Sequence, residues 1–374
     1  MRVRLGDYIK EYSVRNKKNE DIPVYSVTNT QGFCQDYFGK EVASKDKTTY
    51  KIVPRGCFAY NPSRINVGSV DWQRAEERVI VSPLYNVFSV SPELDQQYLY
   101  YYLKSDVALQ RIRNVATGSV RDNLKLDMLC EFPLNLRPKD EQLVVVENLD
   151  KIKSVIRLRQ QELQKLDELV KARFVEMFGG ERWQLVTAGS IMHNMRNGIS
   201  PSNGGNVAER VLTLSAITHG QFDETAWKDG LFDECPPADK RISKSDFYMC
   251  RGNGNKKLVG TGVYSPSDMP SLVFPDTIIA ASVDEDRICL PFLHHEWKQP
   301  SVRRQIEAGA RTTNGTYKVN QKVLSGIEII LPPLDEQRQF TAFVQQIDKS
   351  KVVVQKALDE AQLLFDSLMQ QYFG

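Results

Sequence analysis

The sequence predicts a mixed α/β (α+β) fold with two similar globular domains, separated by two long helices that pack antiparallel as a coiled coil. Three observations predict it: the chain of 374 residues contains one pattern twice, each copy ends in a long run with heptad spacing, and each copy begins with short β-rich segments. Such a repeat indicates pseudo-two-fold symmetry, which suits a partner that repeats along an axis, as duplex DNA does.

The repeat is clearest where the long runs begin. The tripeptide Asp-Glu-Gln at 140–142 recurs at 335–337, and the runs that follow align without a gap to Phe178-Gly179 and Phe373-Gly374. Upstream, residues 118–123 correspond to 315–320. The sequence therefore divides into a first domain (1–139), a central helix (140–180), a second domain (181–334) and a C-terminal helix (335–374).

The long runs have apolar residues at alternating spacings of three and four, which is typical of a coiled-coil seam. The predicted seam comprises Ile152, Ile156, Leu163, Leu166 and Val170 in the first run and Val344, Ile347, Val354, Leu358, Phe365 and Leu368 in the second. Pro138 and Pro333 are suited to the helix starts, and Gly179-Gly180 to the end of the first helix. A helix over 150–178 would measure roughly 43 Å, enough to hold two DNA readers about one turn apart. A coiled coil used only for dimerisation is the alternative.

Each predicted domain combines β-rich segments with one helical stretch. In the first domain we expect strands near 23–27, 57–60, 78–82 and 86–90, and a helix over 92–104. In the second domain we expect strands near 211–215, 247–251 and 277–282, and a helix over 295–307.

Composition restricts the class of protein. Hydrophobic residues make up 41% and charged residues 26%, as in soluble globular proteins, and neither a membrane span nor a signal peptide is found. The six cysteines are scattered without a CxxC pair, which favours reduced thiols in a cytoplasmic protein over a zinc ribbon or disulfide framework. A net charge of +2 is low for a DNA-binding protein, so positive charge must be local or supplied by partner subunits.

Motifs for catalysis are incomplete. The segment at 61–64 lacks the stacking aromatic residue of an amino-methyltransferase motif, and 252–257 lacks the spacing of a Walker loop. The four histidines have no metal-ligand spacing. We therefore expect no catalytic residues, no metal and no cofactor bound by this chain.

The order of parts resembles the specificity (S) subunit of type I restriction–modification systems. The residues that carry the resemblance are the Leu-Pro-Pro-Leu-Asp-Glu-Gln segment at 331–337, its weaker twin at 136–142, and the long helix and domain associated with each. The twin departs from the pattern at Arg137 and Lys139. Arg159 and Lys351 also interrupt the apolar seams, where they either weaken the packing or mark docking sites.

The resemblance implies a non-catalytic subunit whose two target-recognition domains read the halves of an interrupted, asymmetric DNA target. It implies that the helices set the spacing and dock two methyltransferase (M) subunits, which restriction/translocase (R) subunits then join. S-adenosylmethionine, ATP and Mg are expected on those partner subunits. The alternative is a coiled-coil scaffold whose domains bind protein partners.

DNA contacts are expected in loops between strands and in the polar segments before the helices, because amide and cationic side chains read bases and bind phosphates. The first pair of segments supplies Tyr60, Asn61, Ser63, Arg64 and Asn66 in one copy and Arg251, Asn253, Asn255, Lys256 and Lys257 in the other. The second pair supplies Thr117, Ser119, Arg121 and Asn123, and Thr313, Asn314, Thr316 and Lys318. Arg196 is a third candidate. Ordinary polar turns are the alternative explanation for all three.

Overall fold

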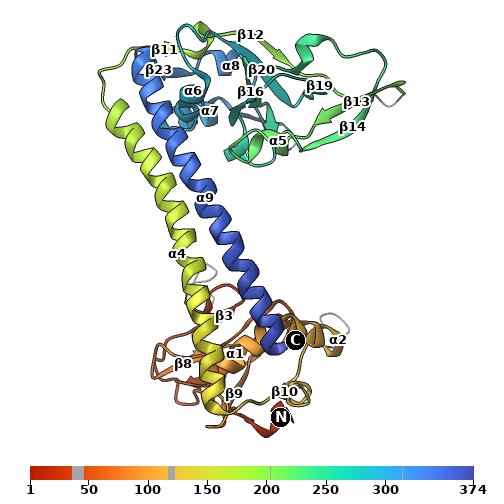
Figure 1. Cartoon of the computed structure of the whole chain (residues 1–374), viewed down its shortest axis with the longest axis vertical. Helices are drawn as coiled ribbons and strands as arrows, with labels where there is room; N and C mark the ends of the chain where they lie inside the picture. The colour runs from red at the N-terminus through yellow and green to blue at the C-terminus, as the bar shows by residue number, and fades with distance from the viewer. Residues whose placement is uncertain (36–45, 117–122, 203, 314) are drawn as a thin grey trace. The chain divides into compact units, whose positions relative to one another are not determined.

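The computed structural model describes residues 1–35, 46–116, 123–202, 204–313 and 315–374 (Figure 1). The chain forms two compact units: unit 1 contains Met1–Leu163 and Val353–Gly374, and unit 2 contains Gln164–Val352. Each unit combines one mixed α/β domain with part of both long helices, which confirms the predicted fold class.

Unit 1 is built around a four-stranded antiparallel sheet in the order β2-β9-β6-β7. Its strands are β2 (Ile9–Glu11), β9 (Asn86–Val90), β6 (Phe58–Tyr60) and β7 (Val70–Trp72). Three antiparallel pairs accompany it: β1 (Arg2–Arg4) with β10 (Pro133–Asn135), β3 (Ser26–Thr28) with β4 (Gly32–Cys34), and β5 (Lys51–Pro54) with β8 (Arg78–Val81).

Side chains cap the starts of two helices in unit 1. The helices of this domain are α1 (Gln96–Lys104), α2 (Asp106–Val115) and α3 (Leu126–Cys130). Asp95 accepts the backbone N–H groups of Gln97 and Tyr98, so α1 starts four residues later than the predicted start at residue 92. Ser105 caps α2 in the same manner.

Unit 2 has a corresponding four-stranded antiparallel sheet in the order β12-β20-β16-β18, and β11 (Leu185–Thr187) pairs with β23 (Glu328–Ile330) as β1 pairs with β10. The sheet contains β12 (Met192–Asn197), β20 (Ile278–Val283), β16 (Asp246–Cys250) and β18 (Gly262–Tyr264). A second sheet has the order β14-β13-β19-β15, with β14 (Trp227–Phe232), β13 (Val207–Leu212), β19 (Met269–Val273) and β15 (Arg241–Ile242). A third contains β17 (Gly252–Asn253), β22 (Thr316–Lys318) and β21 (Arg311–Thr313).

Two predictions for unit 2 were wrong in detail. The helix expected over 295–307 is two helices, α6 (Leu290–Trp297) and α7 (Pro300–Gly309). Pro300 forces the preceding Gln299 into an extended conformation, which ends the first helix and starts the second. The strand expected at 211–215 ends at Leu212, and α5 (Ser215–Thr218) follows; α8 (Gln321–Ser325) completes the domain.

The two long helices are α4 (Lys139–Phe178) and α9 (Leu334–Phe373), each of 40 residues. All the predicted seam residues are buried or half-buried. In unit 1 the Asn148 amide donates to the Tyr372 hydroxyl (3.1 Å), and in unit 2 the Lys351 ammonium binds the Asp167 carboxylate (2.7 Å). These contacts join the early part of one helix to the late part of the other, which confirms the antiparallel pairing.

Gly179 and Gly180 end α4, as predicted. The Gly179 N–H donates to the Val175 carbonyl, and Gly180 has a φ of +92°, which only glycine adopts readily.

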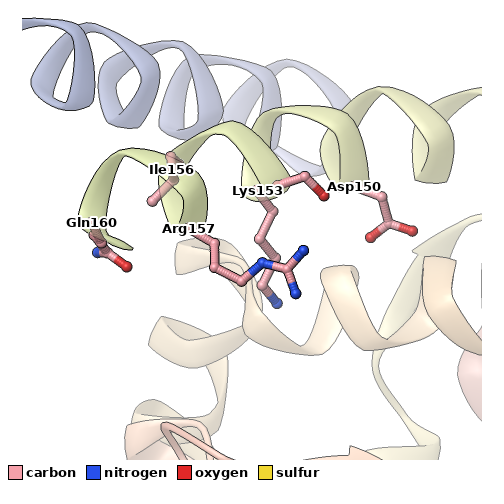
Figure 2. Close-up of a pocket in the computed structure, with 6 residues that line it drawn as sticks. Asp150, Lys153, Ile156, Arg157 and Gln160 are labelled. Atoms are coloured by element: carbon pink, nitrogen blue, oxygen red, sulfur yellow. The ribbon is translucent and has the colours of Figure 1, made fainter. Parts of the chain in front are cut away.

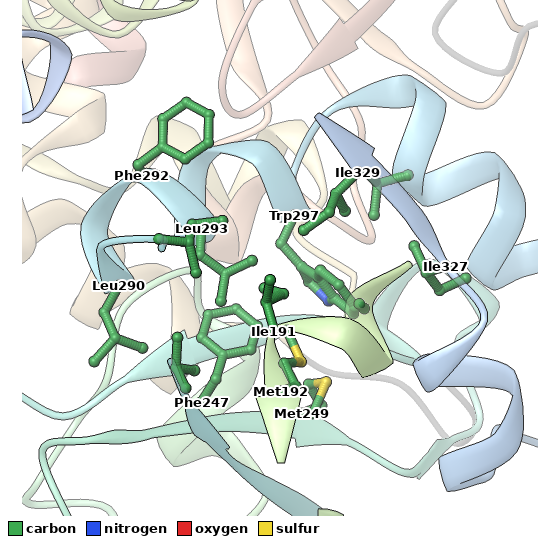
Figure 3. Packing of buried hydrophobic residues seen from close by; sticks show 14 of the residues in the cluster. Ile191, Met192, Phe247, Met249, Leu290, Phe292, Leu293, Trp297, Ile327 and Ile329 are labelled. Atoms are coloured by element: carbon green, nitrogen blue, oxygen red, sulfur yellow. The ribbon is translucent and has the colours of Figure 1, made fainter. Parts of the chain in front are cut away.

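Aromatic side chains pack each domain against the long helices. In unit 2, Phe174 and Phe178 of α4, Phe292 of α6 and Phe340 of α9 form one cluster with ring centroids 5.0–6.4 Å apart. Figure 3 shows the domain side of this core, where Phe292, Leu293 and Trp297 project from α6. In unit 1, Tyr98 of α1 packs on Phe373 at 5.1 Å.

Candidate nucleic-acid interface

In unit 1, two of the predicted segments lie together. The Ser63 hydroxyl donates to the Asn123 side-chain carbonyl (2.6 Å), and the Leu124 N–H donates to the Pro62 carbonyl (3.1 Å). The Asn61 side chain accepts the Ser63 N–H (3.1 Å), which closes the loop on itself. The loop after β6 and the segment before α3 therefore form one polar edge, which we call the unit 1 edge (61–66 and 123).

The unit 1 edge presents one exposed cation. Arg64 is exposed and makes no side-chain hydrogen bond or ion pair with any described residue, and Asn66 is half-buried beside it. Tyr60, in contrast, is fully buried: its hydroxyl donates to the Leu124 carbonyl (3.1 Å) and accepts from Asn86 (2.9 Å). The structure thus places Tyr60 beneath the edge, as a support for it.

In unit 2 the corresponding segments also meet, through backbone pairing. Gly252 and Asn253 in β17 pair with Lys318 and Tyr317 in β22. Beyond β17, the Asn253 side chain accepts the Asn255 N–H (2.8 Å), and the Asn255 side chain accepts the Lys257 N–H (3.0 Å). These turns define the unit 2 edge (251–257 and 311–318, without 314).

The exposed charge on the unit 2 edge is positive. Lys256, Lys257 and Lys318 are exposed, and Thr316 is half-buried between them and the sheet. Arg251 is turned inward, with its guanidinium 3.4 Å from the Asp276 carboxylate. The three lysines have no ion pair with a described residue, so they are available to anions.

Arg196 belongs to the interior of unit 2. Its guanidinium binds the buried Asp246 carboxylate and donates to the Asp239 carbonyl (2.6 Å). The Ser282 hydroxyl also donates to Asp246 (2.9 Å). Breaking such a buried ion pair is costly, so the Arg196 side chain serves to link β12 to β16 across β20.

Several of the predicted contact residues lie where the structure does not describe the side chain or the chain itself. Thr117, Ser119, Arg121 and Asn314 lie outside the described residues, and the Thr313 side chain is not described.

A buried glutamine at the start of each long helix was missed by the sequence analysis. The Gln142 side chain accepts the Asp95 N–H (2.8 Å) and donates to the Glu93 and Arg137 carbonyls (2.9 and 2.8 Å). The Gln337 side chain accepts the Cys289 N–H (2.9 Å) and donates to the Arg287 and Pro332 carbonyls (3.0 and 2.8 Å).

These glutamines join each domain to its long helix. Both side chains are fully buried. Gln142 forms hydrogen bonds with the segment before α1 and with the segment before α4. Gln337 forms the same bonds with the segments before α6 and α9. Their recurrence in the Asp-Glu-Gln tripeptide was visible in the sequence, but the repeat did not indicate that the glutamine side chains would be buried.

The long helices expose apolar residues on the side away from the seam. Leu158 and Leu169 of α4 are 57% and 46% exposed, and Val353 and Leu364 of α9 are 69% and 52% exposed. Under the alignment of the two repeats, Leu158 corresponds to Val353 and Leu169 to Leu364. We call these four residues the outer apolar stripes.

Neither a metal-binding group of side chains nor a membrane-spanning helix is found among the described residues. Within the described ranges, no group of three or more histidine, cysteine or acidic side chains is arranged to hold a metal ion. No helix in the same part of the chain has the length and apolarity needed to cross a bilayer.

Comparison with known proteins gives consistent matches. Residues 4–168 match the model of the type I restriction modification DNA specificity domain. The chain is 22% identical to the type I restriction enzyme EcoKI specificity subunit of Escherichia coli (strain K12), and 21% identical to the StySPI specificity subunit of Salmonella potsdam. Each match covers 98% of this chain and 84% of the relative.

The fold has matches among solved structures as well. A chain from a structure titled for complex assembly and conformational transition of the type I R-M system superposes with a TM-score of 0.63 at 16% identity. The match covers 100% of this chain and 97% of that chain. The chain is thus similar over nearly its whole length to specificity subunits of type I restriction–modification systems, and the solved structure has the same fold.

Proposed function

We propose that this chain is the non-catalytic DNA-reading subunit of a type I complex, with one target-recognition domain at 1–139 and the other at 181–334. Each domain reads one half of an interrupted, asymmetric target through its polar edge. The helical segments 140–180 and 335–374 set the distance between the half-sites. The observation that carries the proposal is that both units bring the same two segments of the repeat together into a polar edge.

The chemistry of the two edges suits DNA. Arg64 in unit 1 and Lys256, Lys257 and Lys318 in unit 2 are exposed cations, which bind phosphates. Amide side chains such as Asn66 and Asn253 stand beside them, and amides can read adenine. Tyr60 and Arg196 act as supports in this proposal, since both are held by internal contacts.

The outer apolar stripes support docking of two copies of one partner. Leu158 and Leu169 are eleven residues apart, close to three helical turns, so they lie on one face of α4. Val353 and Leu364 repeat this arrangement on α9. Equivalent apolar faces on two repeats suit two identical subunits, which we propose are the methyltransferase subunits, with restriction/translocase subunits joining the assembled complex.

Exchange of one domain tests the reading role. Replacing residues 181–334 with the corresponding domain of another specificity subunit should change one half of the methylated sequence and leave the other half intact. Methylation mapping on genomic DNA measures this. A change in both halves would contradict independent reading by the two domains.

Lengthening the helices tests the spacing role. Seven residues inserted after Leu163 in α4, matched by seven inserted before Val353 in α9, add about 10 Å, or about three base pairs, to the helix pair. The half-sites should stay the same while the gap between them grows. An unchanged gap would contradict the spacing role.

The scaffold alternative makes a different prediction for DNA. A DNA-reading complex should lose affinity steeply as salt rises, with a slope set by the number of phosphates contacted. A complex built on a protein-binding scaffold would bind duplex weakly and without dependence on sequence.

A further inference from the structure

Unit 2 contains a cavity of about 1000 Å³ between its domain and the two long helices. Val170 and Phe174 of α4 and Val344 of α9 form apolar walls, whereas His294, His295 and Lys298 supply polar groups from the domain. A cavity of this size, mostly apolar with a few converging polar groups, is typical of a binding site.

The ammonium group of Lys298 has no carboxylate partner in this cavity. Its Nζ donates to the Gly220 carbonyl (2.9 Å) and to His294 Nε2 (2.6 Å). His294 Nδ1 donates in turn to the Gly262 carbonyl (3.1 Å), an arrangement of the neutral imidazole. Lys298 is therefore held by two uncharged acceptors.

The acids of the cavity are engaged elsewhere. Asp167 and Asp348 both bind the ammonium group of Lys351, at 2.7 and 3.5 Å. Among the described residues, no carboxylate oxygen lies within the 4.0 Å of an ion pair from Lys298. Burial lowers the pKa of Lys298 to about 8, because the surroundings stabilise its charge poorly. An incoming anion would supply the missing counter-charge.

Unit 1 repeats this lysine. The matching bonds of Gln142 and Gln337 align Asp95 with Cys289, which aligns Lys104 with Lys298 and Tyr100 with His294. Lys104 Nζ donates to the Asn29 carbonyl (2.9 Å) and lies 5.6 Å from the centre of the Tyr100 ring.

The charge of Lys104 is also poorly compensated. It has no ion pair with a described residue, and burial lowers its pKa to about 8 as well. The two repeats thus place an equivalent, uncompensated cation at the same point of the fold.

Lys104 lines an opening in unit 1. This opening has a volume of about 110 Å³ and is also lined by Phe365 and Met369 of α9. Another of about 530 Å³ runs along α4, where Asp150, Lys153 and Arg157 extend from one face of the helix (Figure 2). Lys153 Nζ, on the larger opening, lies 5.2 Å from the centre of the Tyr100 ring, which Lys104 also approaches.

The geometry favours a protein side chain over DNA as the anion. The cavity in unit 2 is lined by none of the residues of the unit 2 edge, so the two surfaces are separate. Its lining includes Val175, which is 63% exposed, and an apolar lining suits protein better than phosphate. A duplex carries its phosphates on a convex surface that cannot enter a recess, whereas a glutamate or aspartate side chain can.

We propose that the recesses at Lys298 and Lys104 are paired docking sites, each of which binds a carboxylate side chain of one of two identical partner subunits. This proposal rests on the proposed function, because it takes the methyltransferase subunits as the partner. The outer apolar stripes and the two lysines would then contact the same two copies.

A zero-length cross-link in the assembled complex tests the proposal directly. A carbodiimide activates a carboxylate, and the neutral lysine amine attacks it to form an amide with release of the urea. The full chain, assembled with its methyltransferase subunit and treated in this way, should give peptides that join Lys298 and Lys104 to acidic residues of the partner. A phosphodiester gives no such product.

Substitution provides a second measurement. Lys298→Gln should lower the affinity for one methyltransferase copy about tenfold, Lys104→Gln should do so for the other, and native mass spectrometry should show the one-copy complex accumulate. Lys298→Arg should restore most of the affinity. Lys228→Gln, which removes an exposed lysine of β14 outside the cavity, should leave the assembly unchanged.

Three outcomes would overturn the proposal. Normal assembly of Lys298→Gln and Lys104→Gln, combined with weaker DNA binding and a shallower salt dependence, would assign the lysines to phosphate. If both lysine variants assembled normally and the unsubstituted complex gave no cross-links to Lys298 or Lys104, the lysines would have no role in docking, while the proposed function would remain intact. If the unsubstituted chain bound no methyltransferase subunit, the proposed function would fail together with this one.

Discussion

Among the described residues of unit 1, a side-chain hydrogen bond between Ser63 and Asn123 joins the two segments of the polar edge, and in unit 2 the edge contains a three-stranded sheet, whose strand β22 corresponds to residues of unit 1 that lie outside the described ranges. The second sheet of unit 2, β14-β13-β19-β15, has a smaller counterpart in unit 1, where β5 pairs antiparallel with β8 and Val24 bridges Ile80 of β8 in parallel. The attachments to the long helices are alike, from the buried glutamines to the strand pairs β1–β10 and β11–β23. The fold therefore keeps the attachments of each domain to the long helices, which we call the frame, while the sheets near the polar edges differ in extent, as expected if the two domains read unequal half-sites.

The largest expected effect concerns the frame. Gln142→Ala and Gln337→Ala each remove the hydrogen-bond partner of one N–H and two carbonyls, most of them partly buried, at about 1–3 kcal/mol for each group left unpaired. We expect each substitution to lower the unfolding free energy by roughly 3–5 kcal/mol, and by similar amounts because the bonds are the same. Urea unfolding of the full chain measures both.

Gln160→Ala is the matched control, since Gln160 is exposed on α4 and should change the unfolding free energy by less than about 0.5 kcal/mol. A loss below about 1 kcal/mol for only one of the two buried glutamines would show that the frames are not equivalent.

The sequence predicted the frame better than the edges, for physical reasons. Heptad spacing reports burial along a helix directly, so the seam from Ile152 to Val170 and from Val344 to Leu368 could be read in advance. The extended conformation that Pro300 imposes on Gln299 was equally readable, yet the general helical pattern masked it.

The polar segments were harder to interpret. A residue type such as Tyr or Arg does not reveal whether its polar group bonds inward or faces solvent. The Tyr60 hydroxyl donates a hydrogen bond to the Leu124 carbonyl, and the Arg196 guanidinium binds the Asp246 carboxylate. In each pair the two residues are far apart in the sequence. Nothing near Arg196 in the chain indicates that Asp246 will lie beside it. Contacts of this kind are set by the tertiary fold, which local pattern does not reveal.

A second prediction compares Glu296 with Tyr102, which occupy the same position in the two repeats. Glu296 is buried and accepts the Ile330 N–H (3.1 Å), and burial raises its pKa to about 7. The Tyr102 hydroxyl donates to the Pro133 carbonyl (2.5 Å), and burial raises its pKa to about 12. Unit 2 should therefore respond to pH in a range where unit 1 does not.

The raised pKa of Glu296 determines how the unfolding free energy of unit 2 changes with pH. Because the folded pKa of Glu296 lies above the unfolded value, the folded state holds its proton more tightly. Its contribution is fully present below pH 4.5 and is lost as pH rises through about 7, a loss of roughly 3 kcal/mol. Glu296→Gln should remove this loss and stabilise unit 2 above pH 7. His294 and His295, whose pKa values burial lowers to about 3 and about 4, should keep an opposite dependence in which stability falls as pH drops below 6.5.

Hydrogen exchange of amides in β23, measured between pH 5 and 8 and corrected for intrinsic rates, follows unit 2 separately. Tyr102→Phe serves as the comparison: it should cost about 1 kcal/mol at every pH in this range, because the hydroxyl stays protonated. A loss of protection between pH 6.5 and 8 that persisted in Glu296→Gln would assign that loss to another group.

The smallest expected effect on stability concerns the edges. Arg64→Gln in unit 1 and the double substitution of Lys256 and Lys257 by Gln in unit 2 remove exposed cations that have no ion pair with a described residue. Each variant should change the unfolding free energy by less than about 0.5 kcal/mol. In the assembled complex, removal of each cation that binds a phosphate should lower the salt slope of DNA binding by about 1.

The comparison becomes sharper when sequence preference is measured for the same variants. Removing a cation that binds phosphate weakens binding to all sequences alike, whereas removing a side chain that reads a base relaxes preference at one position of one half-site. We expect Arg64→Gln to affect only the half read by unit 1 and the double lysine variant only the other half. Equal relaxation of both halves by either variant would contradict separate edges, and a large loss of stability would show that these side chains support the fold.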